Sequence, residues 1–92
     1  MHDALFQPLQ MGALHAKNRI HMAPLTRGRA AEPMFTPNAL MATYYRQRAG
    51  AGMILTEATG ISREGLGWPS APGIWSDEQT EAWKATTTAV HE

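Results

Sequence analysis

The stretch "RIHMAPLTRGRA", residues 19–30, changes from apolar to polar within a few residues. It begins like a buried strand, which we predict over residues 20–23, because its apolar side chains suit a sheet. Pro24 then interrupts the strand, since proline has no backbone N–H to donate to a sheet. Thr26 follows at the tip, ahead of two arginines. In parallel α/β folds, function lies beyond the carboxyl ends of the strands, so this polar tip is a candidate site.

The stretch "MILTEATG", residues 53–60, has the same design. Three apolar residues predict a second strand, and Thr56 and Glu57 make its end polar. Loops rich in glycine and proline follow both strands, at residues 27–40 and 62–73. Loops of this length are uncommon in compact domains unless they have a function. The polar ends and long loops of both strands therefore indicate a functional site at the carboxyl end of the sheet.

A helix is predicted between the two strands. Thr36 is its expected N-cap, with Pro37 at the first helical position, where a missing N–H costs nothing. Gly50 and Gly52 are expected to end it, because glycine readily adopts the left-handed turn after a helix. One helical face recurs at spacings of three to four and consists of Leu40, Met41, Tyr44, Tyr45 and Arg48.

A second helix is predicted after residue 76. Ser76 and Gln79 have the spacing of a capping box, in which the two residues satisfy each other's backbone N–H groups. The expected apolar face consists of Trp83, Thr87 and Val90. Near the start of the chain, short extended segments on either side of Gly12 predict a hairpin.

The order of these elements predicts an α/β fold with parallel strands. We divide the chain into a hairpin cap (1–18), a first βα unit (19–52) and a second βα unit (53–92). Two parallel strands leave open edges, and eight βα units take about 250 residues. We therefore expect the N-terminal portion of a (β/α)8 TIM barrel, incomplete without further chain.

Composition excludes several classes of function. The chain has 92 residues, and its 8 basic and 8 acidic residues cancel, so neither nucleic acid nor an anionic membrane is an expected partner. Without cysteine there are no disulfides, and the histidines lack metal-ligand spacing, so no metal site is predicted. The start has no signal-peptide pattern, and no apolar run could span a bilayer. We expect a soluble, cytoplasmic chain.

Three stretches resemble the old yellow enzyme family of FMN-dependent ene-reductases. They are "LFQPLQMGALHAKNRIHMAPLTRGRA" (5–30), "YYRQRAGAGMILTEAT" (44–59) and "GWPSAPGIWSDEQTEAWK" (67–84). The resemblance covers nearly the whole chain in family order. It implies a (β/α)8 barrel that holds FMN non-covalently at the carboxyl ends of its strands, with NAD(P)H as the reductant.

The resemblance also implies which residues hold the cofactor. They are Ala23, Pro24, Leu25, Thr26 and Ala58. The Thr26 hydroxyl is expected to hydrogen-bond the flavin near its O4, which adjusts the electron demand of the ring. Ala58 is expected to let the ring lie against the main chain. On the residues alone, a turn cap is the more common role for a threonine such as Thr26, and Ala58 could equally reflect tight packing.

Trp68 matches a family position beside the substrate space, where an indole would form an apolar wall. The alternative is that Trp68 secures its own loop. Arg27 and Arg29 are expected to be solvated or salt-bridged. Glu57 is expected to bind a neighbouring backbone group or an arginine, without a catalytic role. We assign no catalytic residue.

The implied function is reduction of activated C=C bonds in α,β-unsaturated carbonyl compounds. The family's third-strand glutamine, its substrate-binding His-His or His-Asn pair, its proton-donating tyrosine and its phosphate-binding arginines have no counterparts in these 92 residues. We therefore expect the segment to be inactive alone and to need the rest of the barrel. One alternative is an inactive fragment that associates with another chain. Another is a related FMN barrel with different chemistry, such as a dienoyl-CoA reductase or an amine dehydrogenase.

Overall fold

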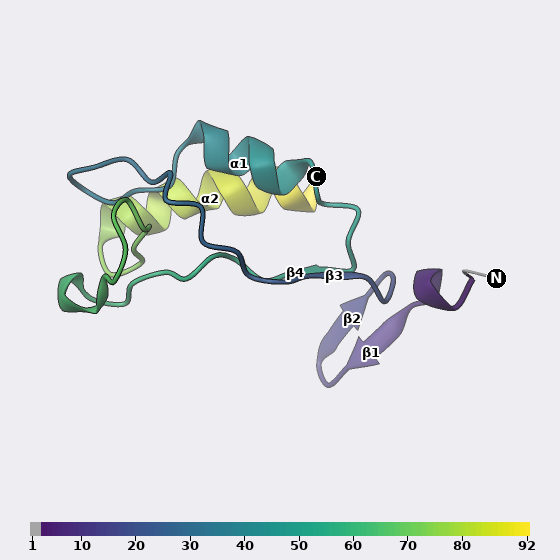
Figure 1. Ribbon diagram of the computed structural model, residues 1–92. Helices are drawn as coiled ribbons and strands as arrows, with labels where there is room; N and C mark the ends of the chain where they lie inside the picture. The colour runs from purple at the N-terminus through teal and green to yellow at the C-terminus, as the bar shows by residue number, and fades with distance from the viewer. Residues whose placement is uncertain (1–2) are drawn as a thin grey trace.

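The computed structural model describes residues 3–92 and is shown in Figure 1. In chain order the elements are η1 (Asp3–Phe6), β1 (Leu9–Met11), β2 (Leu14–Ala16), β3 (His21–Met22), α1 (Ala39–Arg46), β4 (Met53–Ile54), η2 (Arg63–Gly65) and α2 (Asp77–His91). Helices α1 and α2 lie together on one side of the β3–β4 pair. The β1–β2 hairpin extends from one end, and the loops after β3 and β4 lie at the other. No helix among residues 3–92 is long and apolar enough to cross a membrane.

The predicted hairpin is present. Strands β1 and β2 pair in antiparallel fashion, and Gly12 makes the turn with φ +59°, a conformation that favours glycine. The first two residues of the predicted 1–18 segment lie outside the described residues. The division into 1–18, 19–52 and 53–92 stays a prediction.

Strands β3 and β4 pair in parallel, as predicted. The prediction of residues 20–23 was too long, because β3 has only two residues. The Leu55 N–H still donates to the Met22 carbonyl at 3.1 Å. Pro24 then offers no N–H, so the ladder stops. Both sheets in residues 3–92 have two strands, which leaves each strand with an unpaired edge.

Helix α1 begins later than predicted. Its N-cap is Asn38, whose side-chain oxygen accepts the Met41 N–H at 3.1 Å. The predicted cap at Thr36, with Pro37 at the first helical position, is wrong. Thr36 instead forms an antiparallel bridge with Ala31. Its backbone is therefore already paired within the loop, and asparagine caps as well as threonine does.

The end and the buried face of α1 also differ from the prediction. The helix ends at Arg46 with Gln47 as its C-cap, so the prediction that Gly50 and Gly52 end it is wrong. Neither glycine has the positive φ of a left-handed turn. Met41 and Tyr45 are buried, but Leu40 is 65% exposed and does not belong to the core. The buried stripe is therefore narrower than the spacing of apolar residues indicated.

The capping box of α2 is confirmed. The Ser76 hydroxyl accepts the Gln79 N–H at 3.2 Å, and the Gln79 side-chain oxygen accepts the Ser76 N–H at 3.0 Å. Gln79 also donates from its amide nitrogen to the Met34 carbonyl at 2.9 Å. This buried glutamine thus caps α2 and holds the loop before α1 against it.

The hydrophobic core lies between the helices and the strands. Its buried residues are Ala30, Met41, Tyr45 and Trp83, and the partly buried Met22, Tyr44, Ile54 and Val90 pack against them. Thr87, predicted on the buried face of α2, is exposed, and Thr86 is buried instead. Thr86 follows Trp83 by three residues, which brings it to the same side of the helix.

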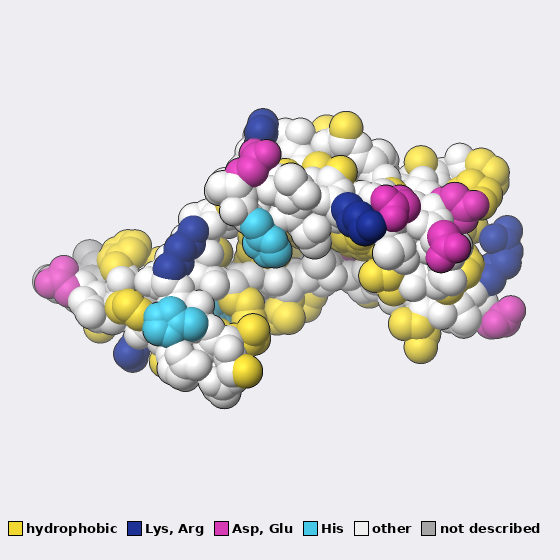
Figure 2. All heavy atoms as spheres, turned by 180° about the vertical axis from the view of Figure 1, so that it is seen from behind, with side chains coloured by type: hydrophobic (Ala, Val, Ile, Leu, Met, Phe, Trp, Pro, Cys, Tyr) yellow, Lys and Arg dark blue, Asp and Glu magenta, His cyan; other side chains and the backbone are white. Residues whose placement is uncertain are grey.

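Large apolar side chains remain at the surface. Leu25 is 59% exposed, Leu55 48% and Ile61 82%. Figure 2 shows such side chains at both ends of the molecule. With two helices over a two-stranded parallel sheet, the described chain is an α/β unit that resembles part of a barrel.

Candidate functional site

The ends of β3 and β4 lie side by side. Met22 is opposite Ile54 in the parallel ladder. The ladder ends after the hydrogen bond from the Leu55 N–H to the Met22 carbonyl. Thr26 and Ala58 each follow four residues after the Met22–Ile54 pair, so both come after the carboxyl ends of parallel strands.

The predicted segment Ala23–Thr26 is exposed throughout. Within residues 3–92 the Thr26 hydroxyl has no hydrogen-bond partner. A capping role would require such a bond, so nothing in the described residues supports the turn-cap alternative. This stretch carries no charged side chain, which suits contact with a flat aromatic ring.

Ala58 and Trp68 come together at one cavity of about 180 Å³. Gly60, Leu66 and Ala71 also line it. The Trp68 side chain is 59% exposed, which argues against the alternative that it secures its own loop. An exposed indole at the mouth of a cavity can form an apolar wall for a ligand.

The loop that carries Trp68 is held against the loop that follows Thr26. The Ala30 N–H donates to the Ser70 carbonyl at 3.0 Å, and the Ser70 hydroxyl donates to the Glu32 carboxylate at 2.7 Å. The two strand-end loops are therefore one connected surface, although they are about 40 residues apart in sequence.

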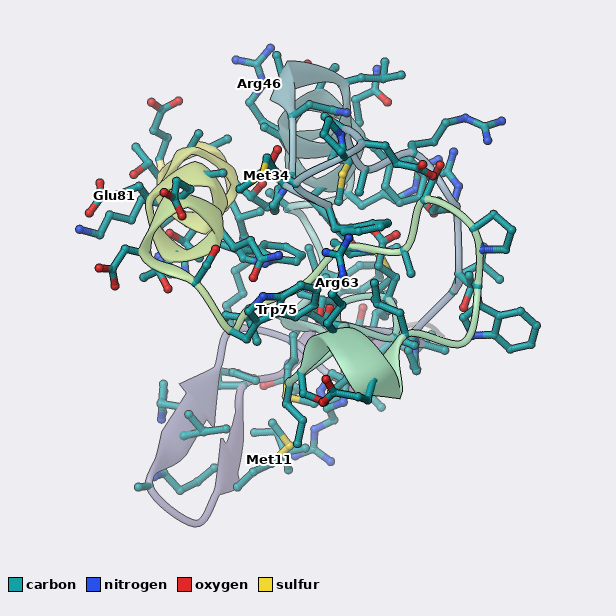
Figure 3. The ribbon with its side chains drawn as sticks, turned by 90° about the vertical axis from the view of Figure 1, so that its left-hand side faces the viewer. Met11, Met34, Arg46, Arg63, Trp75 and Glu81 are labelled. Atoms are coloured by element: carbon teal, nitrogen blue, oxygen red, sulfur yellow. The ribbon has the colours of Figure 1, made fainter. Side chains whose placement is uncertain are left out.

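Figure 3 looks onto this end of the molecule and shows Trp75 and Arg63 near its centre, with Glu81 pointing outward from α2. The Phe35 and Trp75 rings have centroids 6.2 Å apart, and the Arg63 guanidinium lies 5.4 Å from the Phe35 ring. The Trp83 indole N–H donates to the Gly73 carbonyl at 3.0 Å. Trp75 and Trp83 are packing residues, and Trp83 lies on the buried face of α2 as predicted.

Glu57 is 2% exposed and bonds to Tyr45, which is 1% exposed, on α1. The Tyr45 hydroxyl donates to Glu57 Oε2 at 2.7 Å and accepts the Glu57 backbone N–H at 3.0 Å. The prediction of a backbone or arginine partner for the Glu57 side chain was wrong. The helical face indicated that Tyr45 is buried but gave no sign of its partner.

Burial raises the pKa of the Tyr45 phenol above its ordinary value, because removal from water disfavours the charged phenolate. The hydrogen bond that it accepts from the Glu57 backbone acts in the opposite direction, while its bond to the Glu57 carboxylate raises the pKa further. Tyr45 is therefore a neutral hydrogen-bond donor at physiological pH.

Within residues 3–92 Arg27 forms no salt bridge, so the salt-bridged alternative of the prediction finds no support there. Its guanidinium lies 3.6 Å from the centre of the Tyr44 ring, and the Arg48 guanidinium lies 3.8 Å from the same centre. Arg29 is exposed and donates to the Arg27 carbonyl at 3.1 Å. Cation–π contacts thus hold Arg27 over α1, an arrangement that charge counting could not reveal.

Comparison with known proteins identifies the family. Residues 4–92 match the profile described as "NADH:flavin oxidoreductase / NADH oxidase family". The chain belongs to the old yellow enzyme family. Enzymes of this family are oxidoreductases that use FMN with NAD(P)H as reductant.

Solved structures of family members share the fold. The old yellow enzyme homologue from Zymomonas mobilis is 65% identical, with a TM-score of 0.90 over 96% of this chain and 24% of that one. Morphinone reductase is 49% identical, with a TM-score of 0.90 over 96% of this chain and 23% of that one. The architecture seen here is thus that of part of an old yellow enzyme barrel.

A curated relative gives the same picture. "Putative 12-oxophytodienoate reductase 4" from Oryza sativa subsp. japonica is 44% identical over 88 residues, which are 95% of this chain and 23% of the relative. The chain spans about a quarter of the length of the relatives that it matches.

Proposed function

We propose that this chain supplies one side of the FMN site and of the substrate space in an NAD(P)H-dependent ene-reductase. The observation that carries the proposal is the parallel pairing of β3 with β4, after whose carboxyl ends Ala23–Thr26 and Ala58 follow in the chain. Ala58 shares a cavity with Trp68. FMN, when bound, supplies the two-electron chemistry of such a reduction.

The residues have distinct roles in this proposal. The Thr26 hydroxyl, which has no partner within residues 3–92, would hydrogen-bond the flavin edge near O4. Ala23, Pro24 and Leu25 would form a flat support for the ring. Ala58 keeps the second strand end free of bulk where the ring meets the main chain. Trp68, at the cavity beside Ala58, forms an apolar wall for the substrate.

The proposed substrate is a small activated alkene, such as an α,β-unsaturated carbonyl compound. The name 12-oxophytodienoate describes an oxo group in a molecule with carbon–carbon double bonds, which fits this class. An apolar wall at Trp68 suits the hydrocarbon part of such a molecule. We infer a cytoplasmic enzyme, since the absence of cysteine from this chain fits a reducing compartment.

The proposal includes further barrel strands beside β3 and β4. Strands β3 and β4 each have an unpaired edge in the described chain, and the side chains of Leu25, Leu55 and Ile61 are exposed. We propose that the remainder of the barrel, from the same polypeptide or from another chain, covers these groups. The same exposure favours the alternative of a catalytically inactive segment that only associates with another chain.

An FMN titration of the complete barrel tests the proposal. We expect bound FMN with a characteristic visible spectrum and oxidation of NAD(P)H coupled to reduction of an enone. We expect residues 1–92 alone to show no turnover. Intact mass spectrometry and gel filtration identify any second chain. A colourless assembly that binds no FMN would support the inactive alternative.

A further inference from the structure

The segment after β4 is held in an unusual way. The last ladder hydrogen bond is that from the Leu55 N–H to the Met22 carbonyl at 3.1 Å. Beyond it, the Glu57 N–H donates to the Tyr45 hydroxyl rather than to a neighbouring strand. The Glu57 carbonyl accepts from the Thr59 hydroxyl at 2.8 Å. The Tyr45 side chain on α1 thus replaces a neighbouring strand as the hydrogen-bond partner of the backbone, one residue before Ala58.

The contact between Tyr45 and Glu57 fixes both the backbone and the side chain of Glu57. One phenol hydroxyl accepts from the backbone N–H and donates to Oε2. Tyr45 itself belongs to the buried core with Met41 and Trp83. The position of residue 57 is therefore set by the core and not by the exposed strand edge.

The charge at Glu57 is not needed for this geometry. Its second oxygen, Oε1, is buried and has no hydrogen-bond partner within residues 3–92. Arg27 and Arg29 line the same cavity of about 240 Å³ as Glu57, but neither forms a salt bridge with it among the described residues. A glutamine could keep both hydrogen bonds to Tyr45 through its carbonyl oxygen and its backbone.

We propose that Tyr45 and Glu57 are positioning residues that fix the main chain of Ala58 beside the proposed FMN site. This inference rests on the proposed function, because it assigns the buried pair an effect on FMN. Neither side chain needs to touch the cofactor. Their contact places the main chain of residue 58, against which the flavin ring would lie, and any displacement there would alter how the ring is bound.

The test compares three variants in the complete, FMN-loaded barrel. Y45F removes the hydroxyl and both hydrogen bonds. E57Q removes the charge and keeps the geometry. Y44F is the matched control, since it removes a hydroxyl from the neighbouring tyrosine, which has no hydrogen bond from that group within residues 3–92. The readouts are the FMN dissociation constant, the visible flavin spectrum and amide hydrogen exchange at residues 57–59.

We expect Y45F to raise the FMN dissociation constant about tenfold, a change of about 1.4 kcal/mol in binding free energy, because the main chain at residue 58 would be displaced from the flavin. It should shift the flavin spectrum and speed exchange at residues 57–59. Y44F should match the wild type in all three readouts, and E57Q, which keeps the acceptor oxygen and the backbone N–H, should change each readout less than Y45F does. If Y45F lost stability but bound FMN with unchanged affinity and spectrum, the pair would be a purely structural contact and the proposal would fail.

If Y45F does not fold, hydrogen exchange of the wild-type protein tests the proposal instead. The Glu57 amide should exchange at least about a hundredfold more slowly than an unprotected amide, although it lies outside the ladder. Rapid exchange would overturn the proposal. If the wild-type barrel bound no FMN, the proposed function and the effect on the cofactor would both fail. The exchange result would still show separately whether Tyr45 holds residue 57.

Discussion

The two strand ends of this chain occupy equivalent places but are built in opposite ways. The end of β3, Ala23–Thr26, is exposed, and its threonine hydroxyl has no partner within the described residues. The end of β4 contains a fully buried residue, Glu57, whose N–H, carbonyl and Oε2 are all hydrogen-bonded. The end of β4 is thus held by the core, while the end of β3 presents exposed groups that can bind a ligand.

Y45F should have the largest effect on stability. It leaves a buried carboxylate oxygen and a backbone N–H without their partner, so we expect unfolding to become easier by about 3 kcal/mol. Urea denaturation measures the change, and Y44F is the control. A loss below about 0.5 kcal/mol would mean that the end of β4 does not depend on Tyr45.

Alkaline pH should weaken the same end. Because the pKa of Tyr45 is raised in the folded chain, unfolding lets this phenol ionise at its ordinary pKa of about 10. Stability from Tyr45 is fully present below that pH and is lost as the pH rises above about 10. Denaturation at pH 8 to 11 measures the slope. Y45F should show a shallower decline, and an identical slope would contradict the assignment.

T59A should have a moderate effect. It removes the 2.8 Å hydrogen bond to the Glu57 carbonyl, which should cost about 1 kcal/mol. T88A is the matched control, because Thr88 is exposed on α2. Thermal unfolding of both variants gives the comparison. Equal melting temperatures would show that the Thr59 hydroxyl adds nothing to the end of β4.

The sequence was most informative where local chemistry decides structure. Gly12 marked the hairpin turn, and Ser76 with Gln79 marked the start of α2. The start of α1 was missed because Thr36-Pro37 and Asn38 both carry capping signals. Which of them acts depends on the bridge between Ala31 and Thr36, and that bridge is tertiary.

The candidate site was predictable only in part. The polar ends of both strands and their long loops indicated which end of the sheet to examine. Helical spacing showed that Tyr45 faces the core, but its contact with Glu57 spans 12 residues and two elements. The cation–π contact of Arg27 with Tyr44 likewise depends on how the loop folds over α1. Periodicity assigns a side chain to a face and does not name its partner.

T26A should have the smallest effect on stability, and it tests most directly whether the end of β3 contacts the flavin. The side chain is exposed and has no partner among residues 3–92, so stability should stay within about 0.5 kcal/mol of the wild type. In the complete FMN-loaded barrel, however, we predict a shifted flavin spectrum and a changed reduction potential, with T88A unchanged in both. A T26A protein with the wild-type spectrum and potential would contradict the assignment of this strand end to the flavin.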